Sequence, residues 1–297
     1  MRYLTQKIIV LIGSLSIGTY AFLLLLLYFG VFLISSPELL NYTKSLVSEL
    51  FNDDSLSYIG VGFGAQLVDG ALGMAYGACS TSFLLSLGVS PAAASASIHL
   101  AEVFTTAASG ASHYKLGNVH RPLFKALVIP GILGAATGAF LLSEVIDGEA
   151  FKPVVNGYLF IIGFILLRKG IASKIHRKKI KNIGALALAG GMLDSLGGGG
   201  WGPVVNSSLL TKGKHPKYII GTVNTVEFFI AFTSAGVFTL FLGMQHIEII
   251  VGLIIGGVVA APIGAFLVGK IKPRPLIFCV GLLVCFLSLR GLYNYFY

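Results

Sequence analysis

The chain has 297 residues, of which 55% are hydrophobic and 11% are charged, and its formal net charge is +9. These proportions are typical of multispanning membrane proteins and leave no polar stretch large enough for a soluble domain. The basic residues gather in short connections, above all residues 168–181, where they favour a role in membrane orientation over nucleic-acid binding. The three cysteines lie in apolar runs, which argues against a disulfide framework.

The first apolar segment, residues 8–35, follows a basic N-terminus. It is predicted to be an uncleaved membrane span, because its apolar core is longer than that of a signal peptide and no small-residue cleavage site is evident. Seven segments are expected to cross the bilayer, at about 20 residues per crossing. They are 8–35, 91–112, 122–143, 153–168, 216–242, 246–269 and 275–294.

Two further apolar segments, 57–88 and 184–211, are interrupted by glycines. A helix does not run smoothly through Gly197–Gly200, because each glycine costs about 1 kcal/mol relative to alanine and leaves the backbone free to turn. Pro203 then predicts the start of a second helix. Unwound backbone at membrane depth survives only where protein buries it or a watery cavity solvates it. We therefore expect two re-entrant hairpins, a feature that points to the substrate site of a transporter.

If both hairpins are re-entrant, the positive-inside rule gives one consistent orientation. The basic connections, including 115–125 and 168–181, then lie on the cytoplasmic side, and the acidic connections 38–54 and 144–149 lie outside. This places a multi-pass protein in the cell (inner) membrane, with a cytoplasmic N-terminus and an external C-terminus.

A shift of 125 residues aligns the two interrupted segments and the helices that follow them. It matches Asp69 with Asp194, Gly73 with Gly198, Pro91 with Pro216, Glu102 with Glu227, and Ser109 with Ser234. Each copy holds one hairpin and three crossings, so the second copy is expected to be inverted relative to the first. The fold class is an all-α polytopic membrane protein with two inverted repeats. Its predicted divisions are an extra span with an interfacial segment (1–56), repeat 1 (57–168), a basic cytoplasmic linker (169–183) and repeat 2 (184–297).

Three motifs carry a resemblance to a known family. They are Gly197-Gly-Gly-Gly-Trp-Gly-Pro203, Gly221-Thr-Val-Asn-Thr225 after Pro216, and Gly117-Asn-Val119 after Ser109–His113. With their setting in both halves, they resemble the TauE/SafE sulfite exporter family over residues 57 to about 270. The resemblance implies a permease for sulfite, sulfonates, thiosulfate-like or related small anions, and it implies no enzymatic activity.

The candidate substrate site lies where the second half-helix of each hairpin begins. Backbone N–H groups and the helix dipole at such an end attract anions without a basic side chain. Nearby hydroxyl, amide and aromatic side chains could hold oxyanion oxygens or wall the pocket. The candidates are Tyr76, Gly77, Cys79, Ser80, Thr81, Trp201, Gly202, Asn206, Ser207 and Ser208. The alternative for the hydroxyls is a bond to the preceding helical turn, and for the aromatics simple packing.

Four acids lie within the apolar segments: Asp69, Glu102, Asp194 and Glu227. An ionised carboxylate costs at least ~2.5 kcal/mol at the centre of a span, so such groups are usually paired, protonated or functional. His99 and Glu102 share a helix face, as do Asn224 and Glu227. These six residues are predicted either to couple transport to protons or to hydrogen-bond the unwound backbone. We expect no metal site, because one histidine participates and Asn224 stands at the matching place.

The sequence as a whole predicts a secondary transporter, most simply an exporter, that moves sulfite or an organosulfonate by alternating access. Its partners are the small anion, the lipid bilayer and, in a coupled mechanism, protons; no cofactor and no nucleic acid are expected. Two alternatives remain open. One is an anion channel, because glycine-rich loops also line selectivity filters. The other is a membrane subunit of a sulfur-relay system that uses Cys79 as its thiol.

Overall fold

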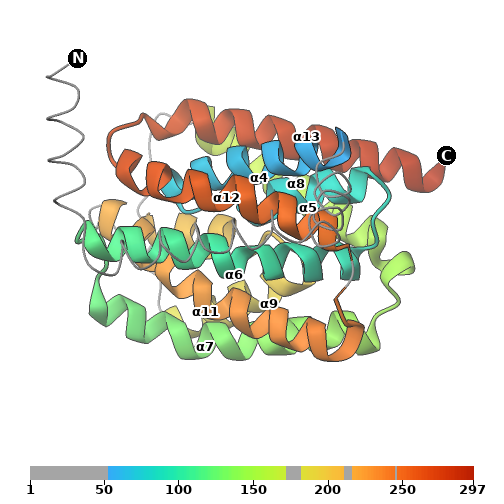
Figure 1. Ribbon diagram of the computed structural model, residues 1–297, viewed down its shortest axis with the longest axis horizontal. Coiled ribbons are helices and arrows are strands. Elements are labelled where there is room, and N and C mark those ends of the chain that lie inside the picture. Colours follow the sequence, from blue (N-terminus) through green and yellow to red (C-terminus); the bar gives the residue numbers. More distant parts are fainter. Residues whose placement is uncertain (1–52, 172–181, 211–215, 245) are drawn as a thin grey trace, which may run out of the picture. The chain divides into compact units, whose positions relative to one another are not determined.

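A computed structural model describes residues 53–171, 182–210, 216–244 and 246–297. All elements in these ranges are helical, which confirms the all-α prediction for the described part of the chain (Figure 1). The predicted first span, residues 8–35, and most of the predicted basic linker lie outside the described residues.

The helices, with π-helical turns marked η, follow one another along the chain. They are α4 (Asp53–Leu72), α5 (Tyr76–Ser86), α6 (Pro91–Lys115), α7 (Arg121–Phe140), η1 (Leu141–Val145), α8 (Gly148–Ile171), α9 (Ile183–Gly197), η2 (Trp201–Asn206), α10 (Ser207–Leu210), α11 (Pro216–Leu242), α12 (Ile247–Leu267) and α13 (Pro273–Phe296).

Five helical stretches are long and apolar enough to cross a membrane. They are Arg121–Val145, Gly148–Ile171, Pro216–Leu242, Ile247–Leu267 and Pro273–Phe296. Each matches one of the predicted crossings. A sixth predicted crossing corresponds to α6, which has 25 residues but carries many serine, threonine and histidine side chains that lower its hydropathy. The protein is therefore a multi-pass membrane protein.

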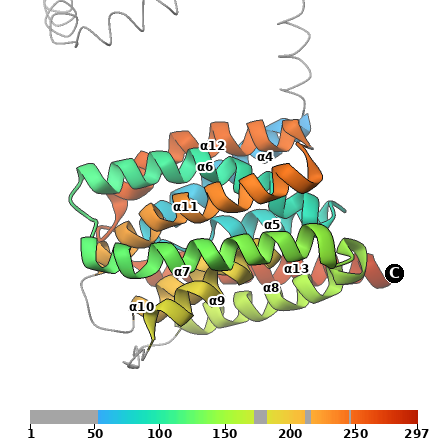
Figure 2. The same ribbon diagram turned by 90° about the horizontal axis from the view of Figure 1, so that it is seen from below.

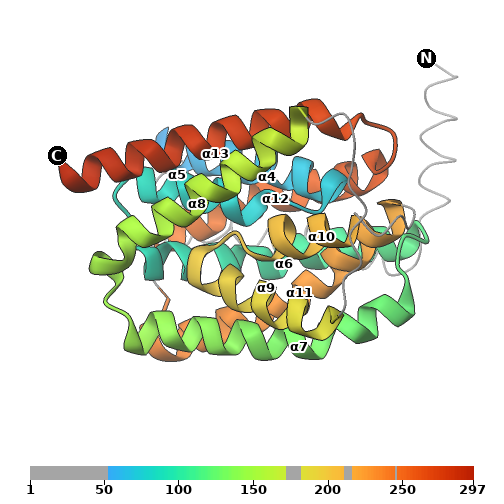
Figure 3. The same cartoon turned by 180° about the vertical axis from the view of Figure 1, so that it is seen from behind.

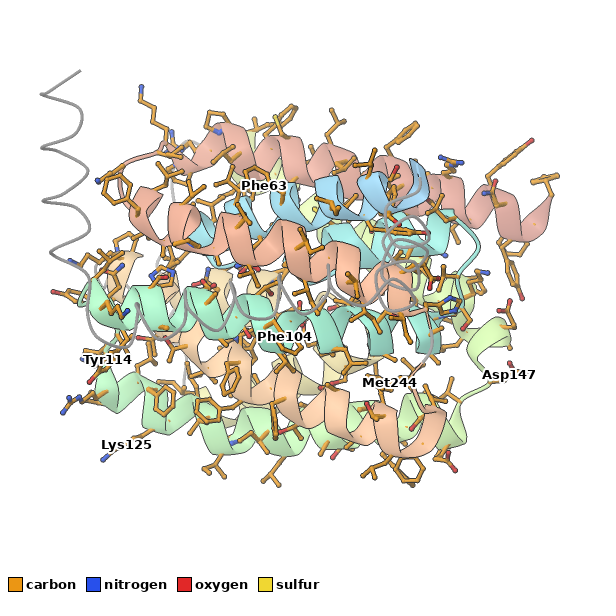
Figure 4. All side chains as sticks on the ribbon, viewed as in Figure 1. Phe63, Phe104, Tyr114, Lys125, Asp147 and Met244 are labelled. Atoms are coloured by element: carbon orange, nitrogen blue, oxygen red, sulfur yellow. The ribbon has the colours of Figure 1, made fainter. Side chains whose placement is uncertain are left out.

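Large apolar side chains point outward from the helices, as expected where lipid is the solvent. Phe104 on α6 is 53% exposed, and Met244, just beyond the end of α11, is 66% exposed; both are labelled in Figure 4. Two exposed charged residues lie at opposite ends of α7: Figure 4 places Lys125, near its start, and Asp147, beyond its end, far apart. The structure thus separates a basic from an acidic end along this helix.

Helices from the two halves of the chain pack in pairs. Helix α4 lies along α12, α7 along α9, α6 along α11, and α8 along α13 (Figures 2 and 3). Glycines allow close approach, as is common between membrane helices. A Cβ on Gly256 would strike the carbonyl oxygen of Ile59 in α4, and one on Gly134 would strike that of Leu188 in α9. The half-helices before both breaks are therefore held by helices of the opposite half.

Both predicted helix breaks are present. Helix α4 ends at Leu72 and α5 begins at Tyr76, while α9 ends at Gly197 and η2 begins at Trp201. Gly73 and Gly198 turn the chain with φ angles of 66° and 61°. These angles lie in the left-handed region that glycine adopts without steric cost. Each glycine donates its N–H to an aspartate carbonyl four residues earlier, Asp69 or Asp194, at 2.5 Å.

Candidate functional site

The two breaks lie directly against each other in the core. A Cβ on Gly77 would collide with the carbonyl oxygen of Gly198, and one on Gly202 would lie 2.6 Å from the Cα of Met74. The Thr81 hydroxyl donates to the same Gly198 carbonyl at 3.3 Å. We call this contact between residues 73–77 and 198–202 the crossing. Because it joins segments so distant in sequence, the crossing is where side chains of both halves can act on one molecule.

Amide side chains of the second half satisfy carbonyl groups of the first break. Asn206 donates from Nδ2 to the carbonyls of Leu72 and Gly73, at 2.5 and 2.9 Å. Asn224 on α11 donates to the Asp69 carbonyl at 3.4 Å and accepts from the Ser109 hydroxyl at 3.0 Å. Unwound carbonyls at membrane depth need such partners. In this conformation the Asn206 amide N–H groups are engaged with protein rather than free for a ligand.

At each break, an aspartate carboxylate also accepts hydrogen bonds from the backbone. Asp194 Oδ1 accepts from the backbone N–H groups of Gly200 and Trp201, both at 2.9 Å. The Asp69 carboxylate accepts from the backbone N–H of Tyr76, seven residues later as in the second break. This bonding matches the structural alternative for the two aspartates. Some of the N–H groups expected to meet an anion are therefore bonded to the protein's own carboxylates in this state.

A second set of contacts surrounds His99 on α6. Its Nδ1 lies 2.8 Å from the carbonyl oxygen of Ser95, one turn earlier. Its Nε2 lies 3.5 Å from Asp194 Oδ2 and 4.0 Å from Glu102 Oε2. All three side chains are at most 5% exposed. Their three facing atoms lie within 4.8 Å of one another, close enough to share a metal ion, although the sequence predicted no metal site.

The remaining acid, Glu227 on α11, is 4% exposed, and its Oε2 has no hydrogen-bond partner among the described residues. It interacts electrostatically with Asp69, Glu102 and Asp194. The four predicted acids are therefore gathered around one place. The buried residues of the described ranges include no lysine or arginine to offset them.

The two predicted aromatic side chains are buried on either side of the crossing. Trp201 is fully buried and donates its Nε1–H to the Val223 carbonyl at 3.2 Å. Tyr76 is 1% exposed, and its hydroxyl faces Thr105 on α6. Gly131 makes room for the Trp201 ring, because a Cβ there would lie 3.2 Å from it. A Cβ on Gly257 would collide with the side chain of Thr105, the residue that the Tyr76 hydroxyl faces.

The other predicted side chains lie in three places. Ser80 and Thr81 are buried on α5 next to the crossing, and the Ser80 hydroxyl has no hydrogen-bond partner among the described residues. Ser207 bonds the Pro203 carbonyl of the preceding turn, and Ser208 is half-buried on α10. Cys79 instead lines an apolar groove with residues of α4 and α13, including Gly60 and Cys279. The structure therefore places Cys79 beside that groove.

Sequence reasoning missed a buried chain of hydroxyls that ties the half-helix α9 to α6 and α11. Ser95 donates to the Ser195 carbonyl, and the Ser195 and Ser234 hydroxyls share a hydrogen bond, both at 2.7 Å. Ser234 had been matched with Ser109, whose hydroxyl likewise bonds a residue of the opposite half. The match between Ser109 and Ser234 in the sequence was the signal that could have predicted these buried hydroxyl contacts.

Comparison with known proteins now decides the family. The family model "Sulfite exporter TauE/SafE" matches residues 58–291 of the chain. The chain belongs to the TauE/SafE family. It is also 44% identical over 247 residues to "Probable membrane transporter protein YtnM" of Bacillus subtilis (strain 168), covering 79% of this chain and 81% of the relative. No solved structure matches it. This TauE/SafE protein is accordingly a membrane transporter and not an enzyme.

Proposed function

We propose that this TauE/SafE protein is a secondary transporter that exports a small sulfur-containing anion, such as sulfite or an organosulfonate. The observation that carries the proposal is the crossing, where two helix breaks from opposite halves meet in the buried core. Broken helices in corresponding positions of two halves are typical of transporter substrate sites. The substrate class follows from the family, whose description names sulfite export.

The proposed architecture is a pair of inverted repeats, each with one re-entrant hairpin. Local geometry supports it, because equivalent residues adopt equivalent roles. Asp69 bonds the N–H of Tyr76 as Asp194 bonds that of Trp201. The helix pairings are also reciprocal: α7 of the first half packs on α9, and α12 of the second half packs on α4. Such reciprocity is expected when two copies of one unit are related by a pseudo-two-fold axis.

The substrate would bind beside the crossing, held by buried hydroxyl groups. The Ser80 hydroxyl oxygen next to the crossing has no hydrogen-bond partner among the described residues, and neither have the hydroxyl oxygens of Tyr76 and Thr105, which face each other. A hydrogen bond to a charged group contributes about 1.5–3 kcal/mol, so two or three such donors could hold an oxyanion at useful affinity. Ser80 lies on the sector of α5 between Tyr76 and Gly77, on the side that faces the crossing.

The burial of this site supports alternating access. The side chains of Ser80, Thr81 and His99 are at most 1% exposed, so the structure is closed around them. In the proposed cycle, the helices that flank each break rock against the opposite half and open the crossing to one side at a time. An inside-negative potential favours the exit of an anion by about 2.3 kcal/mol per charge at 100 mV, which supports export. A channel would need a continuous path instead, and the buried crossing argues for the carrier.

Counterflow of labelled anions into proteoliposomes tests this function. We expect saturable uptake of sulfite or of members of a sulfonate panel, accelerated by the unlabelled anion inside. Replacing Ser80 with alanine should raise the half-saturating concentration roughly tenfold or more, because the variant lacks a donor to a charged group. The matched control is Ser143→Ala, which removes a hydroxyl bonded to the Ala139 carbonyl far along α7. Non-saturating flux without trans-stimulation would indicate a channel, and no flux of any panel anion would remove the substrate class.

A further inference from the structure

The buried acids have no lysine or arginine buried beside them within the described part of the chain. Asp69, Glu102, Asp194 and Glu227 are all at most 4% exposed, and no lysine or arginine is buried with them. His113, a second buried histidine on α6, is engaged elsewhere, with the Gly70 carbonyl and Asn118. Buried carboxylates are normally paired with cations or coordinate metals. An anion bound at the crossing would add to the same negative charge.

His99 presents a free nitrogen to this cluster. Its Nδ1 lies 2.8 Å from the Ser95 carbonyl oxygen, which can accept a hydrogen bond but cannot donate one, so Nδ1 carries the hydrogen. The Nε2 lone pair of the neutral ring then faces Asp194 and Glu102, and this nitrogen has no hydrogen-bond partner among the described residues. A histidine that binds a metal through one nitrogen almost always donates its other N–H to a carbonyl or carboxylate in this way.

The aspartate is held in the same manner. Asp194 uses Oδ1 to accept the Gly200 and Trp201 amides, which fixes the carboxylate and leaves Oδ2 directed at His99. Both Asp194 Oδ2 and Glu102 Oε2 lack hydrogen-bond partners among the described residues. For the histidine and the aspartate, therefore, one polar atom is anchored by backbone while the other faces the common centre.

The spacing of the three atoms is compatible with a shared metal ion. The Nε2 to Oδ2 distance of 3.5 Å is longer than the 2.7–3.2 Å of an N–H···O bond. Around a four-coordinate ion with bonds of about 2.0–2.1 Å, neighbouring ligand atoms lie roughly 3.3–3.4 Å apart. The distance of 4.0 Å from Nε2 to Glu102 Oε2 closes to this value with a small movement of the flexible glutamate.

We propose that His99 Nε2, Glu102 Oε2 and Asp194 Oδ2 bind a divalent transition-metal ion of the zinc class. One imidazole and two carboxylates form a donor set that suits Zn²⁺ and its neighbours. Three protein ligands leave a fourth position for water or for an oxygen of a bound oxyanion. The ion supplies positive charge beside the crossing, where no lysine or arginine of the described residues is buried. The site draws its ligands from α6 and α9, so it forms only when both halves are assembled.

Zinc binding to the purified protein tests the proposal without a transport assay. The protein carries a removable tag free of histidine, is stripped with a chelator, titrated with Zn²⁺, desalted and analysed for metal by mass spectrometry. We expect the wild type to retain about one Zn²⁺ ion per chain in a competition with chelator. Asp194→Asn keeps an Oδ1 acceptor for the two amides and replaces Oδ2. It should weaken zinc binding by more than about 100-fold, because even partners outside the ligand set affect metal affinity 10–100-fold.

Asp69→Asn is the matched control. It makes the same chemical change at the first break, and Asp69 is not one of the three proposed ligands. The zinc content of this variant should equal that of the wild type. Glu102→Gln provides a second ligand variant, at a residue of α6 rather than of a break, and it decides the test if Asp194→Asn unfolds at a lower temperature. Wild-type protein that retains no zinc, or ligand variants that retain as much as the wild type, would overturn the proposal. Since binding is measured directly, neither result depends on which anion the protein transports.

Discussion

Gly77→Ala is expected to destabilise the protein by about 2 kcal/mol or more and to reduce transport at least about tenfold. The added Cβ would strike the carbonyl oxygen of Gly198 and lie 2.8 Å from its carbonyl carbon. Both are backbone atoms, so no side-chain rotation relieves the collision. Gly198 itself is fixed by its left-handed φ and by its bond to Asp194. Thermal unfolding in detergent and the counterflow assay measure the two effects.

Gly236→Ala is the matched control for this prediction. Gly236 lies in α11, and a Cβ there would meet no atom within 4 Å. The change should leave transport intact and stabilise the helix by up to about 1 kcal/mol, since alanine is the better helix former. The expected results for the two alanine variants therefore have opposite signs. Equal stability of Gly77→Ala and the wild type would mean that the two breaks are not in contact.

Asp194→Ala is expected to lower the free energy of unfolding by about 2 kcal/mol or more, whereas Asp194→Asn should retain most of it. Alanine leaves the buried N–H groups of Gly200 and Trp201 without an acceptor, and each such group costs about 1–3 kcal/mol. Asparagine still offers an oxygen to both. Chemical or thermal unfolding of the three proteins at one pH separates these cases.

The equivalent pair at the first break sharpens this comparison. The Asp69 carboxylate accepts a hydrogen bond from the backbone N–H of Tyr76. Asp69→Ala should therefore also lower the free energy of unfolding, whereas Asp69→Asn should retain most of it. If asparagine destabilised either position as strongly as alanine, the negative charge rather than the hydrogen bonds would be what holds the break.

The helix breaks could be predicted because their cause is local. Gly197–Gly200 disfavours a helix whatever surrounds it, and the match between Gly73 and Gly198 in sequence reappears as nearly equal φ angles. Five apolar helices were predictable for the same reason, since hydropathy depends on composition alone. The polar helix α6 was placed by its length and by its match with α11, although its composition resembles that of a membrane span less closely.

The contacts of the candidate site were not predictable, because they arise where distant segments meet. Spacing placed His99 and Glu102 on one helix face, but it could not bring Asp194 to His99, since that contact requires the second break to cross the first. The same holds for Asn206, whose amide satisfies carbonyls of the first break. Cys79 illustrates the converse: adjacency in sequence to Ser80 did not place it at the crossing, because successive helical side chains point about 100° apart.

The most direct test of the central claim, that the substrate binds at the crossing and reaches it from either side in turn, is labelling of a single cysteine at Ser80. Ser80→Cys is introduced after Cys79, Cys279 and Cys285 are replaced by alanine, and a membrane-impermeant thiol reagent is applied to vesicles of each orientation. The account predicts labelling from both sides, slowed about tenfold by a transported organosulfonate at ten times its Kd, since only the free carrier reacts. Labelling from one side alone, or at a rate that the transported anion does not change, would contradict it.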